Sequence, residues 1–200
     1  SYREALQVHR EFGRDECRQI TWLNDAGHVL QRVGRHDEAL ESYREALEIC
    51  RRTDCAGRQK ADCLESIGLS LSELGRYEEA LGAFREALNI YRQSEGADIK
   101  MARCHVNAGW ALGVLRRFEE ALAEYREALD IYRKLPNVDQ DRGDCLLRVG
   151  NVLYWDGRFE GARESYCQAL EVYRRLKGAE RQQADCLVSI GKAQVMLDRY

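Results

Sequence analysis

The sequence repeats itself with a period of 41 residues. The stretch GRYEEALGAFREALNIYR, Gly75 to Arg92, has close copies that begin at Gly34, Arg116 and Gly157. At an offset of 41 the chain aligns with itself without a gap, so these copies belong to one register. A fixed period of about 20–50 residues is the signature of a solenoid or another stacked array. The chain is therefore expected to stack similar units rather than to fold around one central core.

Each column of this alignment holds one kind of residue. The columns that carry the pattern are a glycine column (Gly27, Gly68, Gly109, Gly150, Gly191), two alanine columns (Ala39, Ala80, Ala121, Ala162; Ala5, Ala46, Ala87, Ala128, Ala169) and two aromatic columns (Tyr2, Tyr43, Phe84, Tyr125, Tyr166; His36, Tyr77, Phe118, Phe159, Tyr200). Glycine inside a helix costs roughly 1 kcal/mol relative to alanine. Its recurrence predicts that two helices approach closely there. We expect the alanine columns to face the glycines and the aromatic columns to fill the remaining gaps.

Within each unit, apolar residues recur at steps of three and four, as in Leu64, Ile67, Leu71 and Leu74. That spacing predicts two amphipathic helices per unit, and the glycine between them suits a helix carboxyl terminus. The fold class predicted is all-α, an α-solenoid of stacked antiparallel helix pairs. We expect a single array over 1–200, with helices near 16–33, 36–52, 57–74, 77–93, 98–115, 118–135, 139–156, 159–176 and 180–197. The corresponding organisation is a partial helix 1–11, repeats 16–52, 57–93, 98–135 and 139–176, and an incomplete repeat 180–200.

Eight cysteines do not imply disulfides here. Four of them, Cys63, Cys104, Cys145 and Cys186, recur once per repeat. Equivalent helices in a stack lie about 8–10 Å apart, whereas a disulfide needs Cα atoms closer than about 7 Å. We interpret these four as small buried apolar residues. The remaining cysteines show neither C-x-x-C spacing nor a nearby histidine pair, so no metal site is expected.

Composition and motifs exclude several classes of function. The formal net charge of −3 gives no bias toward nucleic acid, and the longest apolar run, Ala108 to Leu115, is far too short to span a membrane. No phosphate-binding loop, G-x-S-x-G or H-E-x-x-H motif occurs. The four histidines fall in four different columns, so His36 and His105 are interpreted as packing residues. We expect no enzyme activity, no cofactor and a cytoplasmic location.

The pattern of small, alanine and aromatic columns on a helix–turn–helix unit resembles the tetratricopeptide repeat family over nearly the whole chain. The period departs from the usual length of about 34, and arginine stands where the family typically ends its second helix with proline. The longer helices are similar to those of kinesin light chains and of polarity and signalling adaptors. The resemblance implies a right-handed superhelix whose first helices line a concave side that commonly holds peptides.

Carried over column by column, the resemblance implies a lining that is polar and acidic in the first half and richer in aromatic residues and arginine in the second. Aromatic residues and arginine dominate binding energy at interfaces, and an asparagine amide both donates and accepts hydrogen bonds to a peptide main chain. The partner expected is a protein or peptide segment with an apolar anchor and some acidic character. An open alternative is that Trp110 and Trp155 only fill space between neighbouring units. The expected partner-binding residues are Arg103, Asn107, Trp110, Arg148, Asn151, Tyr154, Trp155 and Lys192.

The predicted function is a protein-interaction module, a scaffold or sensor that binds a partner in its groove. The alternative is a regulatory domain of a larger enzyme or of a nucleotide-driven signalling protein. Binding of nucleic acid is disfavoured because the lining carries no basic stripe, and no membrane partner is expected. Since neither end of the sequence supplies a polar capping unit, self-association through the two ends is a further expectation.

Overall fold

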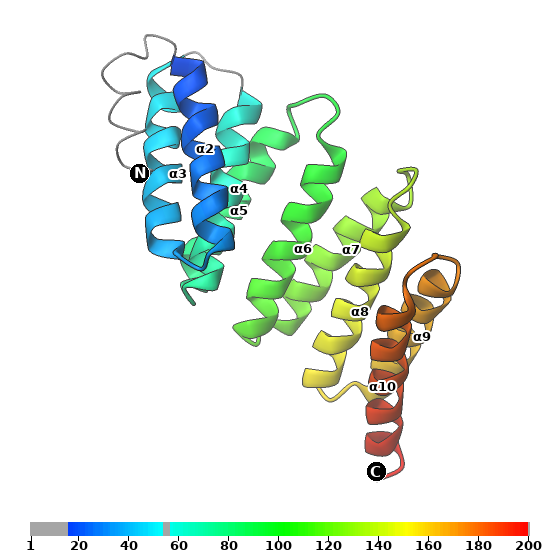
Figure 1. Cartoon of the computed structure of the whole chain (residues 1–200). Coiled ribbons are helices and arrows are strands. Elements are labelled where there is room, and N and C mark those ends of the chain that lie inside the picture. Colours follow the sequence, from blue (N-terminus) through cyan, green and yellow to red (C-terminus); the bar gives the residue numbers. More distant parts are fainter. Residues whose placement is uncertain (1–15, 54–56, 200) are drawn as a thin grey trace. The chain divides into compact units, whose positions relative to one another are not determined.

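The computed structural model describes residues 16–53 and 57–199, and every regular element in these ranges is an α-helix. This confirms the all-α helical repeat predicted from the sequence. The helices, labelled in Figure 1, are α2 (Glu16–Arg32), α3 (His36–Arg52), α4 (Gly57–Glu73), α5 (Tyr77–Tyr91), α6 (Asp98–Val114), α7 (Phe118–Tyr132), α8 (Asp139–Trp155), α9 (Phe159–Arg174) and α10 (Glu180–Leu197).

Each described helix begins at the residue that the columns predict, while several end one to three residues earlier than predicted. The expected partial helix 1–11 and the aromatic column position Tyr200 lie outside the described residues. The chain forms two compact parts, which we call the amino-terminal unit (up to Ala97) and the carboxy-terminal unit (from Asp98). A single continuous array and its right-handed superhelix stay predictions.

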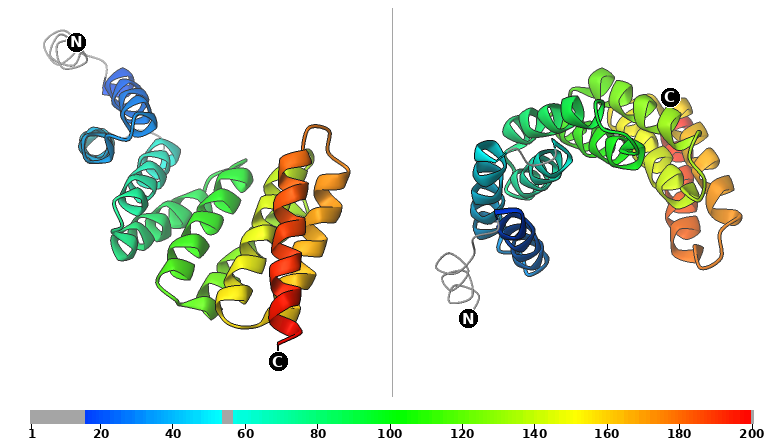
Figure 2. Two further views of the ribbon diagram at one scale, coloured as in Figure 1. Left: turned by 60° about the horizontal axis from the view of Figure 1, so that its bottom comes forward. Right: turned by 90° about the horizontal axis from the view of Figure 1, so that it is seen from above.

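Inside each unit every helix packs against the next one along the chain. The amino-terminal unit stacks α2 to α5 in this way, and the carboxy-terminal unit stacks α6 to α10. Figures 1 and 2 show the two helices of each pair side by side, joined by a short turn. In a stacked repeat, each helix pair is expected to contact only the pairs next to it along the chain.

The glycine column makes room for aromatic rings, which corrects one expectation. An added Cβ atom at Gly68 would lie 2.5 Å from a ring atom of Phe84, far inside van der Waals contact. The described alanines of the two columns, which we expected opposite the glycines, are fully buried, but the atoms nearest to the added Cβ belong to the aromatic ring. Four glycines of this column therefore each lie against the aromatic residue found 16 positions later in the same pair. The pairs are Gly27 with Tyr43, Gly68 with Phe84, Gly109 with Tyr125, and Gly150 with Tyr166.

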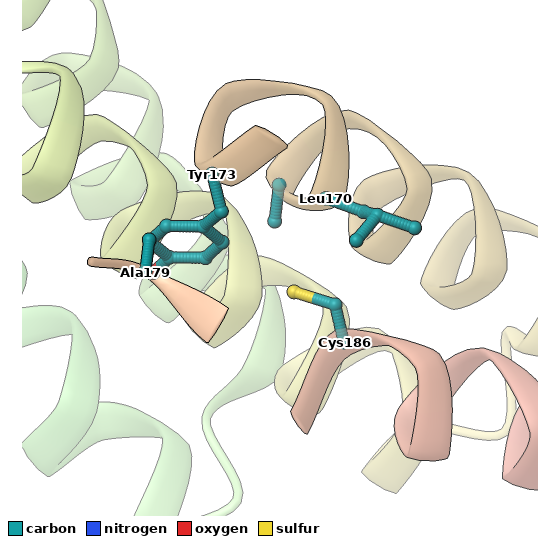
Figure 3. Packing of buried hydrophobic residues seen from close by; sticks show 5 residues of the cluster. Leu170, Tyr173, Ala179 and Cys186 are labelled. Carbon is teal, nitrogen blue, oxygen red and sulfur yellow. The ribbon is translucent and has the colours of Figure 1, made fainter. Parts of the chain in front are cut away.

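The repeated cysteines belong to the same buried layers. Cys63, Cys104, Cys145 and Cys186 are fully buried and form no disulfide, as predicted. Burial raises the pKa of the Cys145 thiol to about 12. Figure 3 shows the layer between α9 and α10, where Leu170, Tyr173, Ala179 and Cys186 pack together with Ala169. These cysteines act as small apolar residues.

The turns inside the pairs repeat as well. Glycine occupies the left-handed position at Gly34, Gly75 and Gly157, and Arg116 adopts the same conformation with φ of 60°. The residue that follows precedes the second helix and forms a two-pronged ion pair with a glutamate three positions on, as Arg76 does with Glu79. The fourth copy has Gly161 at the glutamate position, and Arg158 instead binds Glu119 of α7 at 2.8 Å. This bond ties neighbouring pairs together.

Candidate partner-binding site

The predicted site residues all lie on α6, α8 and α10, the first helices of the carboxy-terminal unit. We call the surface that these three helices present the first-helix face. Helices α6 and α8 contact each other directly, although α7 lies between them in sequence. In Figure 1 these first helices form one row, with α7 and α9 behind them. Side chains from different repeats therefore share one surface.

Trp155, at the end of α8, is the most exposed aromatic residue on this face. Its side chain reaches toward α6, where ring atom Cζ3 lies 3.7 Å from the position that a Cβ atom on Gly113 would occupy. Even so, 47% of Trp155 stays exposed, and Val114 beside Gly113 is 39% exposed. The indole both packs on the neighbouring first helix and presents apolar surface. The packing alternative that the sequence left open is thus seen for this residue, and its contact with a ligand stays a prediction.

Two of the predicted polar residues are held by tyrosines of the second helices. Asn151 accepts a hydrogen bond from the Tyr166 hydroxyl at 2.8 Å. Arg148 hydrogen-bonds the Tyr125 hydroxyl, and its charge lowers the pKa of that tyrosine, which burial raises more strongly. Both side chains are half-buried. They are therefore fixed in orientation by the fold, which reduces the entropy that a partner has to remove on binding.

Tyr154 lies at the junction of α8 and α9. Its ring meets the Phe159 ring edge to face, with centroids 5.4 Å apart, a favourable geometry for aromatic pairs. Trp110 on α6 is half-buried and occupies the column that holds Asn151 on α8. These two aromatic residues contribute less exposed surface than Trp155 does.

The other three predicted residues differ in their surroundings. Arg103 is exposed on α6. Burial raises the pKa of the Tyr132 hydroxyl, and the positive charge of Arg103 reduces that rise. Asn107 is half-buried on α6, and Lys192 is exposed on α10. Placement of all eight residues on the first helices agrees with the column assignment, and their role in binding stays a prediction.

Sequence reasoning missed a set of bonds between tyrosines and acidic residues. The Tyr91 hydroxyl donates to Asp62 at 2.7 Å and to Glu65 at 3.0 Å, and the Tyr173 hydroxyl donates to Asp144. Arg103 occupies the column of Asp62 and Asp144. A tyrosine column with the 41-residue period was visible in the sequence and was the signal that could have revealed these contacts.

His105 was interpreted as a packing residue, and it is indeed only 4% exposed. It also contacts Glu124 of α7 through Nδ1 at 2.6 Å, which links the two helices of its pair. Within residues 16–53 and 57–199 no group of three or more His, Cys, Asp or Glu side chains is arranged to hold a metal ion. No helix in the same ranges has both the length and the hydropathy needed to cross a membrane.

The fold and the face define a class: a stack of helix pairs whose first helices offer a shared surface. Tetratricopeptide repeat models match residues 1–52, 18–93 and 59–134, and another matches residues 142–183. The chain therefore belongs to the tetratricopeptide repeat family. No curated protein sequence matches it.

BtubC and RapI are two of the solved structures that share the fold. BtubC (BKLC) from P. vanneervenii superposes with a TM-score of 0.79 at 23% identity, over 88% of this chain and 72% of the other. The apo form of RapI superposes with a TM-score of 0.79 at 17% identity, over 98% of this chain and 77% of the other. At these identities the likeness concerns the fold.

Proposed function

We propose that this chain is a protein-interaction module, and that its carboxy-terminal unit binds a peptide segment of a partner on the first-helix face. The observation that carries the proposal is Trp155, which is held against Gly113 of α6 and is still half-exposed. A large aromatic side chain in a fixed position excludes water around an apolar anchor at low entropic cost. The family supports binding of protein partners and gives no support to catalysis by these repeats.

The ligand proposed has an apolar anchor and some acidic character. The anchor would lie on Trp155 and Val114, while Arg103, Arg148 and Lys192 supply positive charge along the same face. Asn107 and Asn151 would meet the main chain of the ligand, with the Asn151 Nδ2 group donating because its Oδ1 already accepts from Tyr166. Trp110 and Tyr154 would border the anchor from α6 and α8.

The second candidate, a regulatory domain within a larger enzyme or nucleotide-driven signalling protein, uses the same face and differs in what the rest of the polypeptide does. A cytoplasmic location also stays a prediction from the sequence. Both proposals require that the face bind a polypeptide, so one experiment addresses the step that they share.

The test is selection of peptides from a random display library on the purified chain, followed by titration of one selected peptide by fluorescence anisotropy. Trp155→Ala and Arg148→Ala should each weaken binding by about 1–4 kcal/mol, the range for interface hot spots. Higher salt should weaken the arginine-dependent part more, because exposed charges are screened within about 8–10 Å. Melting curves must first show that both variants fold, since Arg148 also bonds Tyr125.

Glu79→Ala and Glu120→Ala are the matched controls, because both glutamates lie on second helices in exposed ion pairs. Their affinities should equal that of the wild type. If these two changes abolish binding while Trp155→Ala and Arg148→Ala leave it intact, the second helices form the binding surface and the proposal is wrong.

Self-association is a further proposal, supported by the surface of α10. Leu187, Val188 and Val195 are each more than half exposed, and an added Cβ at Gly191 would meet nothing within 4 Å. We expect a second copy of the chain to cover this surface. Sedimentation velocity should show a mass that rises with concentration, and Val188→Asp should abolish the rise; a monomer at all concentrations would contradict self-association.

A further inference from the structure

A pocket of about 220 Å³ opens in the carboxy-terminal unit where α7, α8 and α9 meet. Its apolar part consists of Leu129, Leu146 and Val172, and Arg133, Arg142 and Arg175 surround that part. On α8, Leu146 and the site residue Arg148 are two positions apart, or about 200° around the helix axis. The pocket therefore lies on a different side of α8 from Arg148.

The amino-terminal unit has an equivalent place, and there it is bridged internally. Lys60 of α4 forms an ion pair with Glu86 of α5 at 3.1 Å. Two periods later along the sequence, these positions are Arg142 on α8 and Gln168 on α9, and both line the pocket. The positive charge is thus kept, while the carboxylate that spans the helix pair is replaced by a neutral amide.

The charges around the pocket favour an acidic ligand. Arg175 stands where the amino-terminal unit has Gln93, so the lining carries three arginines. Glu171 is the acidic residue of the lining, in place of Asn89, which leaves a formal charge of +2 on the lining residues. Arg133 and Arg142 are also paired with Asp130 and Asp139, whose side chains are more than half exposed.

Arg133 and Arg142 keep further N–H donors beyond those used in these ion pairs. The pair between Arg142 Nη2 and Asp139 Oδ1, 3.0 Å apart, joins residues of the same helix. A guanidinium has five N–H donors in a planar fork, so a second carboxylate can be bound from the pocket side. The Arg142 side chain is 30% exposed, and charge-assisted hydrogen bonds are stronger where water is partly excluded.

We propose that this pocket binds a glutamate side chain of a partner polypeptide. Its carboxylate takes the place that Glu86 holds in the amino-terminal unit and accepts hydrogen bonds from Arg142 and Arg175. Its methylene groups lie on the apolar part formed by Leu129, Leu146 and Val172. This site is independent of the proposed peptide site on the first-helix face.

The probe is a blocked tetraglutamate peptide, with blocked tetraglutamine as the uncharged counterpart. The readout is the set of arginine Nε–Hε signals in NMR spectra of the 15N-labelled chain, assigned by substitution. Tetraglutamate should shift the Arg142 and Arg175 signals, and tetraglutamine should not. Arg142→Gln should weaken tetraglutamate binding on the order of tenfold, as expected for loss of a charge-assisted hydrogen bond. Arg126→Gln, an exposed residue of α7 outside the pocket, is the control and should leave it unchanged.

The decisive variant is Gln168→Glu, which restores the acidic residue found at Glu86. This carboxylate should pair with Arg142 inside the molecule and lower tetraglutamate affinity on the order of tenfold, whereas Gln168→Ala should retain it. Trp155→Ala should also retain it, so failure here is distinguishable from failure of the first-helix site. The proposal is overturned if no arginine signal shifts up to the solubility limit of the peptide, if all surface arginines shift alike, or if Gln168→Glu binds as well as Gln168→Ala.

Discussion

Phe84→Ala is expected to lower the free energy of unfolding by about 3–5 kcal/mol, the range for removing a large aromatic side chain from a core. Phe84 is fully buried in α5, and its ring fills the space beside Gly68 of α4. The loss combines the transfer of the ring from the interior with the cavity that it leaves. Urea denaturation followed by far-ultraviolet circular dichroism measures the change.

Arg85→Ala, at the next position and exposed, is the control for Phe84→Ala. It should change stability by no more than about 0.5 kcal/mol. Because contacts in a stacked array pass only between neighbours, hydrogen exchange in Phe84→Ala should accelerate in α4 and α5 and stay unchanged in α8 and α9. Equal stability losses at positions 84 and 85 would mean that Phe84 does not support the helix pair.

Gly68→Ala is expected to destabilise the chain by about 1–3 kcal/mol, the usual cost of overpacking. In a helix the same change ordinarily stabilises by roughly 1 kcal/mol. The sign reverses here because the new Cβ atom would lie 2.5 Å from the Phe84 ring, so that the ring or the helix must shift. Thermal and urea unfolding of the variant measure the effect.

Gly82→Ala provides the matched comparison, since Gly82 is also inside a helix but an added Cβ there meets nothing within 4 Å. This variant should gain about 0.5–1 kcal/mol. Combining Gly68→Ala with the smaller side chain of Phe84→Leu should cost less than the sum of the two single changes. Stabilisation by both glycine substitutions would show that the ring does not occupy this space.

The sequence was sufficient to predict the helices because the same apolar spacing and the same turn residues recur in each 41-residue unit. Every described helix begins where the columns place it. The partner of the glycine column was predicted wrongly for a physical reason. Periodicity shows which positions carry small or large side chains. It does not show which of several nearby side chains on the next helix lies against a given glycine. Only the crossing of the two helices decides that Phe84, and not an alanine, lies against Gly68.

The candidate site shows the same limit. The column that contains Trp155 could be assigned to a first helix from the sequence, yet its contact with Gly113 depends on how α6 and α8 approach each other. Asn151 and Arg148 were predicted as polar groups facing a ligand, and both also bond tyrosines of second helices. Hydrogen-bond partners across a helix pair follow from side-chain geometry, which residue spacing alone does not specify.

The most direct test of the proposed function uses the three tryptophans, Trp22, Trp110 and Trp155. Each gives one indole N–H signal in an NMR spectrum, and Trp22 belongs to α2 in the amino-terminal unit. During titration with a selected peptide, the Trp155 signal should shift most, Trp110 should shift less, and Trp22 should stay in place. Binding that shifts Trp22 alone, or that shifts backbone signals of α7 and α9 and none of the indoles, would contradict a binding site on the first-helix face.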